Sequence, residues 1–531
     1  MASDGVTTRS APAQSGDRTI TDRRRGRWIV ATTILGSSIA FIDTTVVNVA
    51  LPVIQRDLHA TGDEAQWVVE SFALVLAGCI LIGGALGDKA GRRKIYVIGT
   101  VIFGLASAAC GFATGVPWLV AARGVQGIGA ALLIPGSLAI LGACFEGDAR
   151  ANAIGNWSAF TAIAPAAGPV LGGWLVQHIS WRWVFFINPP IAVAVIVLAY
   201  AHVPESRADS GGTLDWPGAA TATLGLAGLV TGALEMPRLG AHNALVWGSL
   251  LAGAIILAGF LLIESRSRAP MVPLSLFNDR MFSGTNLLTL FLYAALSGAL
   301  YFVPFNMIQV QGYSPTAAGG VLVPTTVLVF ILSQQAEGLM KRCGAALLLA
   351  IGPSVVALGF ALFARPFIGG SYWTTYFPAA LVLGVGLGLT VAPLTTSVMN
   401  AVPASNVGVA SGVNNAVART AGVLGLAVTA VIAAHVFGPA LDTRVAALHL
   451  PASVAQDLAR QHIDLAAATV PRGLDPARAR LVQHAIGASF VDSFRIVMLT
   501  GAALAIASGI IGSFSVSRTH RRESRGSAAA V

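Results

Sequence analysis

Three charged side chains interrupt the apolar stretches near the start of the chain. Asp43 lies in "AFIDTTVVNVALP", Glu70 lies in "WVVESFAL", and Arg123 directly follows "WLVAA". A charge inside the hydrocarbon of a membrane is costly, so such a group normally faces the protein interior or water and has a partner. Burial raises the pKa of an unpaired carboxylate, and a carboxylate that titrates near neutrality can load and release a proton. The two carboxylates in this setting predict a proton-coupling site.

Each of the three residues also has a structural explanation. The same pattern would arise from an aspartate held by another helix, a glutamate facing external water at the end of its span, and an arginine whose side chain reaches the interface. We favour the proton site, with Asp43 as the first candidate and Glu70 as the second. The sequence leaves open whether Asp43 works alone or shares the proton with Glu70.

The elements that must hold these residues are membrane helices. Only 11% of the 531 residues are charged and 55% are hydrophobic, whereas roughly a quarter of the residues of a soluble domain are charged. Apolar blocks of about 20 residues, the length that crosses a hydrocarbon core of roughly 30 Å, recur along nearly the whole chain. We therefore predict an all-α polytopic membrane protein.

Hydropathy predicts 14 spans, and the distribution of basic residues supports an even number. Basic residues gather in alternate short loops and in both tails, which places both termini in the cytoplasm by the positive-inside rule. The net charge of +9 follows this pattern rather than covering one face, so it does not indicate nucleic-acid binding. We expect a multi-pass monomer in a lipid bilayer, a cell membrane of the bacterial inner-membrane type.

Two six-helix halves with two helices inserted between them account for the 14 spans. The stretch "GALGDKAGRR" after span 2 has a degenerate echo, "EGLMKRCGAA", after span 10, as expected of two related halves that meet at a central cavity. The predicted units are a cytoplasmic basic tail (1–27), an N-terminal six-helix half (28–203), a two-helix insertion (204–284), a C-terminal six-helix half (285–514) with a long external loop (436–491), and a second cytoplasmic basic tail (515–531).

The most specific short motif of the chain is "GGALGDKAGRRK", residues 83–94. Its glycines permit a tight turn, and its acidic and basic side chains can pair with each other or with neighbouring helix ends. A generic basic loop is the alternative, but charge alone does not explain the order of the residues. We predict a cytoplasmic gate formed by Gly84, Asp88, Gly91 and Arg92.

Besides "LGDKAGRRK", the chain carries four further distinctive stretches, namely "DTTVVNVALP" (43–52), "RGVQGIGAAL" (123–132), "APAAGPVLGG" (164–173) and "WRWVFFINPP" (181–190). Through these five motifs the chain resembles transporters of the major facilitator superfamily, and in particular their 14-span drug:proton antiporters. The resemblance implies the major facilitator fold with 14 transmembrane helices arranged 6+2+6. It also implies a role in proton transfer for Arg123.

The stretch "APAAGPVLGG" predicts a closely packed, bent helix at the interface between the halves. Small residues four apart let helices approach closely, and a proline removes a backbone hydrogen bond. Plain helix packing would select the same residues. In the family this motif is the hallmark of antiporters, although Ala164 replaces its first glycine here. The resemblance implies an antiporter helix that depends on Gly168, Pro169, Gly172 and Gly173.

The substrate cavity is predicted only in outline. Polar and aromatic side chains of several spans are candidates for its lining, although aromatic residues more often serve packing. Arg419 either lines the cavity or pairs with a carboxylate. The candidates are Asn48, Gln126, Tyr301, Phe305, Gln309 and Arg419.

These features predict a transporter and not an enzyme. None of the three lysines ends a G-x-x-x-x-G-K phosphate loop, so an ion gradient rather than ATP is the expected energy source. The sequence carries no metal-ligand spacing and no nucleophile constellation, so neither a metal nor a cofactor is expected. We expect a proton-coupled antiporter that exports hydrophobic or amphipathic compounds (drugs, antibiotics or metabolites) by alternating access. The alternative is proton-coupled uptake, or lipid or metabolite transport, by the same fold.

Overall fold

The computed structural model describes most of residues 23–528 of the chain. Inside that range it leaves out 61, 208–214, 241–242, 268–269, 271, 314, 370, 404–405, 462–467 and 472–473. Two residues of the predicted site, Asn48 and Pro169, have side chains that lie outside the described set.

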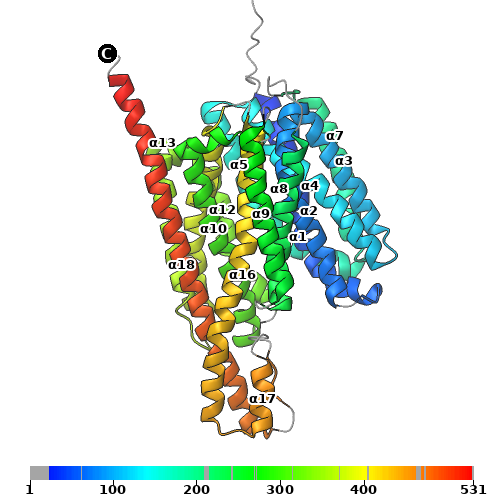
Figure 1. The fold of residues 1–531 in the computed structure, drawn as a ribbon, viewed down its shortest axis with the longest axis vertical. Coiled ribbons are helices and arrows are strands. Elements are labelled where there is room, and N and C mark those ends of the chain that lie inside the picture. Colours follow the sequence, from blue (N-terminus) through cyan, green and yellow to red (C-terminus); the bar gives the residue numbers. More distant parts are fainter. Residues whose placement is uncertain are drawn as a thin grey trace, which may run out of the picture.

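Long helices run up and down through the described chain (Figure 1). A bilayer offers no water to backbone amides and carbonyls, so apolar segments form helices that satisfy these groups internally. In the described residues, 11 helical segments are long and apolar enough to cross a membrane. The prediction of an all-α polytopic membrane protein is confirmed.

The helices fall into three sets along the chain. The first set comprises α1 (Arg23–Asp57), α2 (Gly62–Ala90), α3 (Arg92–Gly111), α4 (Val116–Cys144), α5 (Gly147–His178), α6 (Trp183–Phe186) and α7 (Asn188–His202). The second comprises α8 (Trp216–Leu239) and α9 (Ala244–Arg266). The third comprises α10 (Arg280–Phe305), α11 (Pro315–Gly320), α12 (Val323–Gln334), α13 (Ala336–Cys343), α14 (Ala345–Phe363), α15 (Phe377–Asn400), α16 (Val407–Ala447), α17 (Ala452–Arg460) and α18 (Pro476–Ala528).

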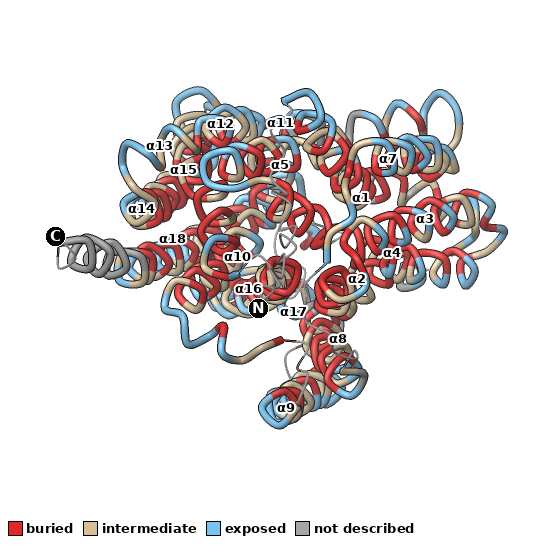
Figure 2. Tube along the Cα trace, turned by 90° about the horizontal axis from the view of Figure 1, so that it is seen from above, coloured by how far each residue is buried: buried red, intermediate tan, exposed pale blue. Residues whose placement is uncertain are grey.

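Seen along the bundle, the first and third sets form two groups side by side, and α8 and α9 stand beside their junction (Figure 2). The groups meet where α2 and α4 contact α16 and where α5 contacts α12, α13 and α15. The inserted helix α8 packs against both α2 and α16. The insertion therefore covers one side of the seam between the groups.

The two ends of the bundle differ. We call the end where α1 begins and α18 finishes the terminal end, and the opposite end, beyond which α16, α17 and α18 project, the loop end (Figure 1). At the terminal end the groups touch closely, since a Cβ atom on Gly84 would lie 2.3 Å from the carbonyl oxygen of Gly408. There Arg150 also donates a 3.0 Å hydrogen bond to the carbonyl of Met399. The seam is thus closed at the terminal end.

The two short loops that echo each other in the sequence contain glycines in the same conformation. Gly91 between α2 and α3 has φ +113°, and Gly344 between α13 and α14 has φ +77°. Side chains other than hydrogen are strained at such angles, so glycine lets each pair of antiparallel helices join directly. This shared turn gives the weak sequence match a structural counterpart.

Candidate substrate cavity and buried charge cluster

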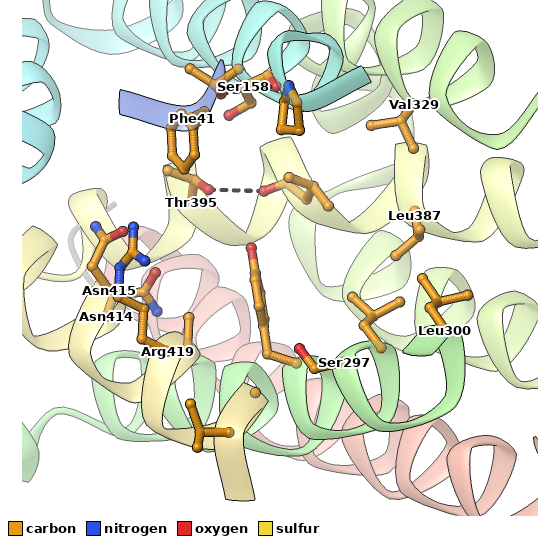
Figure 3. Close-up of a pocket in the computed structure, with 18 of the residues that line it drawn as sticks. Phe41, Ser158, Ser297, Leu300, Val329, Leu387, Thr395, Asn414, Asn415 and Arg419 are labelled. Carbon is orange, nitrogen blue, oxygen red and sulfur yellow. Dashed lines mark hydrogen bonds between the residues drawn. The ribbon is translucent and has the colours of Figure 1, made fainter. Parts of the chain in front are cut away.

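A cavity of about 710 Å³ lies between the two groups of helices (Figure 3). Its walls come from α1, α2, α4, α5 and α8 on one side and from α10, α12, α15 and α16 on the other. Ligand cavities of roughly 300–1,000 Å³ hold drug-sized molecules. Most of the lining is apolar, with side chains such as Phe41, Trp157, Leu300, Val329 and Leu387. The cavity is therefore large enough and apolar enough to hold an amphipathic compound.

Close packing of α1 against α5 holds one wall of the cavity. Thr45 Oγ1 donates a 2.9 Å hydrogen bond to the carbonyl of Pro165, which lines the cavity. A Cβ atom on Gly168 would lie 1.9 Å from Thr45 Oγ1, and one on Gly172 would lie 3.1 Å from the carbonyl oxygen of Val46. A Cβ atom on Gly173 would meet nothing within 4 Å. Of the predicted antiporter-helix glycines, Gly168 and Gly172 therefore form the contact with α1.

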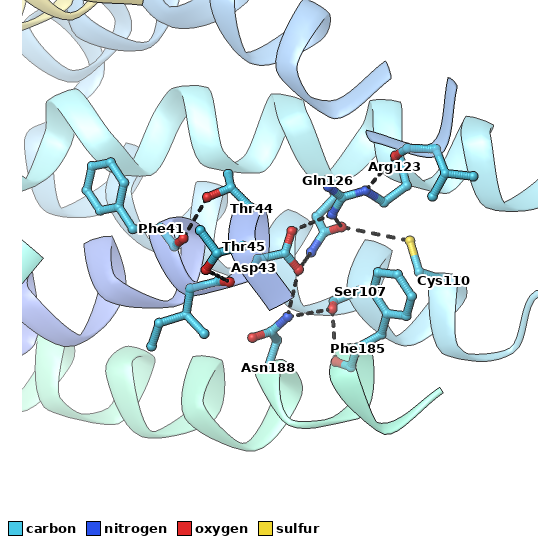
Figure 4. A network of polar contacts seen from close by, with 12 residues as sticks. Phe41, Asp43, Thr44, Thr45, Ser107, Cys110, Arg123, Gln126, Phe185 and Asn188 are labelled. Carbon is cyan, nitrogen blue, oxygen red and sulfur yellow. Dashed lines mark hydrogen bonds and ion pairs between the residues drawn. The ribbon is translucent and has the colours of Figure 1, made fainter. Parts of the chain in front are cut away.

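Next to this wall, Asp43 of α1 and Arg123 of α4 form a buried ion pair (Figure 4). Asp43 is 1% exposed and Arg123 is 0% exposed. Two charges taken out of water must be paired and hydrogen-bonded, because each would otherwise cost several kcal/mol. The structure thus brings together two of the three residues predicted for proton coupling.

Arg123 keeps further contacts besides the aspartate. Its Nε donates to the carbonyl of Val68 at 3.1 Å, and its Nη1 donates to Gln126 Oε1 at 2.8 Å. The guanidinium carbon lies 4.4 Å from the centre of the Phe72 ring, a cation–π distance. The arginine is therefore anchored to α2 and α4 independently of the charge on Asp43.

The second oxygen of Asp43 accepts two amide hydrogen bonds. Gln126 Nε2 donates to it at 2.9 Å and Asn188 Nδ2 donates at 3.1 Å. Asn188 Nδ2 also donates to Ser107 Oγ at 2.9 Å, and Ser107 Oγ donates in turn to the carbonyl of Phe185 at 2.9 Å. Asn188 and Ser107 were not among the predicted site residues. The only sequence signal was the amide inside the stretch "WRWVFFINPP".

Glu70, the second predicted proton carrier, is buried on α2 at 8% exposure. It lies two residues from Val68 and from Phe72, the residues through which α2 contacts Arg123. Residues two apart on a helix point to different sides, so Glu70 does not share the face of α2 that Arg123 touches. The hydrogen bonds described for Asp43 come from Arg123, Gln126 and Asn188.

The predicted gate residues gather at the terminal end. Arg92 Nη2 lies 2.7 Å from Asp88 Oδ1, and both side chains are buried. The other oxygen, Asp88 Oδ2, accepts a 2.9 Å hydrogen bond from the backbone N–H of Val409. Val409 lies in the first turn of α16, where free N–H groups favour a carboxylate. Gly84 contacts Gly408 on the same helix, and Gly91 makes the following turn. The motif thus ties α2 to α16.

Of the six predicted cavity residues, Arg419 lines the cavity. Gln126 belongs to the buried charge cluster, and Tyr301 is 48% exposed with its ring 5.1 Å from that of Phe305. Neither Tyr301, Phe305 nor Gln309 is among the described lining residues.

The polar lining contains residues that sequence reasoning did not single out, notably Ser158, Thr161, Asn414 and Asn415. The pair "NN" in "GVNNAVARTAG", one turn before Arg419, was the available signal.

Comparisons with known proteins agree with the fold. A family model described as the Major Facilitator Superfamily matches residues 33–426. Multidrug resistance protein Stp of Mycobacterium tuberculosis is 34% identical over 401 residues, which cover 74% of this chain and 73% of Stp. The tetracenomycin C resistance and export protein of Streptomyces glaucescens is 30% identical over 493 residues, 90% of each chain. The crystal structure of the human organic anion transporter MFSD10 (TETRAN) matches with a TM-score of 0.59 at 14% identity, covering 92% of this chain and 99% of that one, a likeness that shows the fold alone.

Proposed function

The chain belongs to the Major Facilitator Superfamily, and from the geometry of its buried charges we propose that it is a proton-coupled antiporter that exports amphipathic small molecules by alternating access. It is a multi-pass membrane transporter and not an enzyme, and its bacterial relatives include drug- and antibiotic-resistance exporters.

The proposed architecture is 14 membrane helices arranged 6+2+6. With α5, α8 and α12, which pack among the 11 apolar segments, the described chain would reach that number. The first six-helix half would end at α7, the insertion would be α8 and α9, and the second half would run from α10 to α18. Both basic tails would lie in the cytoplasm, so the terminal end would be the cytoplasmic end.

The observation that carries the proton-coupling proposal is the buried pair of Asp43 and Arg123. In its charged form Asp43 ties α1 to α4 through the guanidinium. A proton on Asp43 cancels that attraction, while Arg123 keeps the carbonyl of Val68, the amide oxygen of Gln126 and the ring of Phe72. The arginine can therefore stay buried through both protonation states. Loading and releasing one proton then changes how firmly α1 is held.

A short path links this pair to the substrate. Thr45, two residues after Asp43, bonds the carbonyl of Pro165 on α5, and Pro165 lines the cavity. A shift of α1 on protonation would therefore move a wall of the cavity. This arrangement supports competition between the proton and the substrate, which is the requirement for antiport.

Closure at the terminal end supports an outward-facing state. Because Asp88 holds the N-terminus of α16 against α2, loading of substrate from the cytoplasmic side would need this contact to break. Alternating access would then consist of opening the terminal end while the loop end closes, with the proton state of Asp43 biasing the balance.

Everted vesicles from a strain that lacks its own pumps test the proposal. A panel of growth assays first identifies a compound to which the chain confers resistance. Adding that compound to energised everted vesicles should release protons from their interior, whereas a symporter working inward would show no such release. Asp43→Asn should abolish the release, because an amide takes up no proton.

Asp57→Asn is the matched control, since Asp57 is also on α1 but lies near the loop end. Hydrogen bonds from Trp181 at 2.8 Å and from Arg182 at 2.9 Å hold the pKa of Asp57 below its ordinary value. Asp57 therefore stays ionised at physiological pH and exchanges no proton there. Full proton release by Asp43→Asn would refute the assignment of the proton to this residue.

A further inference from the structure

The described lining of the cavity carries a positive charge and no negative charge. Arg419 of α16 lines it, and among the described residues of the lining none is aspartate or glutamate. The arginine of the other group of helices, Arg123, is neutralised by Asp43, but Arg419 has no such partner in the described structure. Its Nε has no hydrogen-bond partner among the described residues.

An arginine in this position is not explained by packing alone. A cation inside a membrane protein is costly and normally pairs with an anion or faces a water-filled cavity. A structural arginine would donate the N–H groups of its planar guanidinium to carboxylates or carbonyls of the protein, as Arg123 does. Arg419 instead presents an uncompensated positive charge to the space that the substrate would occupy.

The charged and amide side chains of the cavity lie apart from part of its apolar lining. Arg419, Asn414 and Asn415 lie together on one side, whereas Leu300, Leu387 and Val329 lie across the cavity from them (Figure 3). Asn414 is fixed by its Nδ2, which donates to Thr289 Oγ1 at 2.9 Å, and Asn415 is fixed by a 2.9 Å bond to the carbonyl of Ser411. The polar side is therefore ordered before any ligand arrives, so little freedom is lost on binding.

We propose that the cavity selects amphipathic anions, compounds with an apolar body and a carboxylate, sulfonate or phenolate group that Arg419 binds. The anionic group would pair with the guanidinium in a charge-assisted contact, and the apolar body would lie against the leucine and valine side chains. Amphipathic cations would be disfavoured by the same charge. This inference names the substrate class of the proposed exporter and rests on the cavity being its substrate site.

Two dyes with the same ring system provide the test. 8-Anilinonaphthalene-1-sulfonate is an anion, and N-phenyl-1-naphthylamine is its neutral counterpart without the sulfonate. Binding of each to the purified full chain is measured by equilibrium dialysis against protein-free micelles of the same detergent. Ethidium serves as the amphipathic cation.

Arg419→Gln should weaken binding of the sulfonate dye by about tenfold or more, which is the usual scale for losing a charge-assisted hydrogen bond. Binding of the neutral dye should change by less than about threefold, which also shows that the variant is folded. Arg419→Lys should retain the preference for the anion. Arg495→Gln, an arginine of α18 that does not line the cavity, should leave both dyes unaffected.

The proposal would be overturned if Arg419→Gln weakened the binding of both dyes to the same extent, or if it left the binding of the sulfonate dye unchanged. Tighter binding of ethidium than of the sulfonate dye to the unmodified chain would overturn it too. The test needs no pH gradient, so it is independent of proton coupling. Asp43→Asn should keep the preference for the anion even though it loses proton-driven export.

Discussion

The Asp43 carboxylate is 1% exposed and the Arg123 guanidinium is 0% exposed, so both are costly residues to bury. The sequence could flag both, because a charge within an apolar stretch is rare and has few explanations. It could not pair them, since Asp43 and Arg123 are 80 positions apart and meet only through the packing of α1 on α4. Asn188 and Ser107 escaped prediction because polar uncharged residues are common in membrane helices.

The pair makes a prediction about stability. Arg123→Gln leaves the Asp43 carboxylate buried without its cation, and removing one partner of a buried ion pair typically costs about 3–5 kcal/mol. Adding Asp43→Asn removes the uncompensated charge. The double variant should therefore unfold at a higher temperature than Arg123→Gln alone, as measured by thermal unfolding in detergent at neutral pH. A double variant no more stable than the single one would show that the pair is not coupled in this way.

At the scale of helices, small residues decide where elements touch. The sequence predicted a small-residue face on α5 from its spacing, but the spacing alone did not distinguish the glycines. Gly168 and Gly172 contact α1, whereas a side chain on Gly173 would enter open space. The direction of a helix face depends on which neighbour it packs against, and that neighbour, α1, is more than 100 residues earlier in the chain.

Gly168→Ala should therefore damage the protein while Gly173→Ala should not. A methyl group at 168 would lie 1.9 Å from Thr45 Oγ1 and 3.0 Å from the backbone nitrogen of Val46, so α1 and α5 must move apart. Overpacking of this kind typically costs about 1–3 kcal/mol. We expect a lower unfolding temperature and weaker export for Gly168→Ala. Equal behaviour of the two variants would contradict the close contact between α1 and α5.

At the scale of the whole molecule, the sequence predicted membrane helices and two related halves around a central cavity, but not most of the residues that line the cavity. The described lining residues come from nine helices, and each helix contributes only a few side chains. The type of an aromatic or amide residue does not indicate whether its side chain faces lipid, a neighbouring helix or the cavity. Tyr301 and Asn415 illustrate this, because the exposed tyrosine was a candidate and the cavity asparagine was not.

The two groups of helices are also bridged by an ion pair at the terminal end. Lys341 of α13 lies 2.8 Å from Asp148 of α5 and 2.7 Å from Glu337. Hydrogen bonds to Asp148 and then to Glu337 raise the pKa of Lys341 above its ordinary value of 10.5. A raised folded pKa means that the pairing is fully present below 10.5 and is lost only as the pH rises through the folded value. The bridge therefore does not respond to pH changes near neutrality.

Locking this bridge should stop transport. In a Cys343→Ser background, Asp148→Cys with Lys341→Cys places two thiols across the terminal end, and a short reducible cross-linker should join them. Cross-linking should abolish export and reduction should restore it, because the terminal end must open during alternating access. The single-cysteine variants treated in the same way are the controls. Undiminished export by the cross-linked protein would show that this end does not move.

In the proposed mechanism substrate and proton compete through Asp43, and a count of the protons released by the purified protein measures this competition. A transported compound without a titratable group near neutrality is added to the chain in weakly buffered detergent solution, and released protons are measured with a pH indicator. We expect the unmodified chain to release protons when the compound binds, and we expect Asp43→Asn to bind the compound but to release none. Equal release by both proteins, or no release by the unmodified chain at any pH between about 5 and 9, would contradict it.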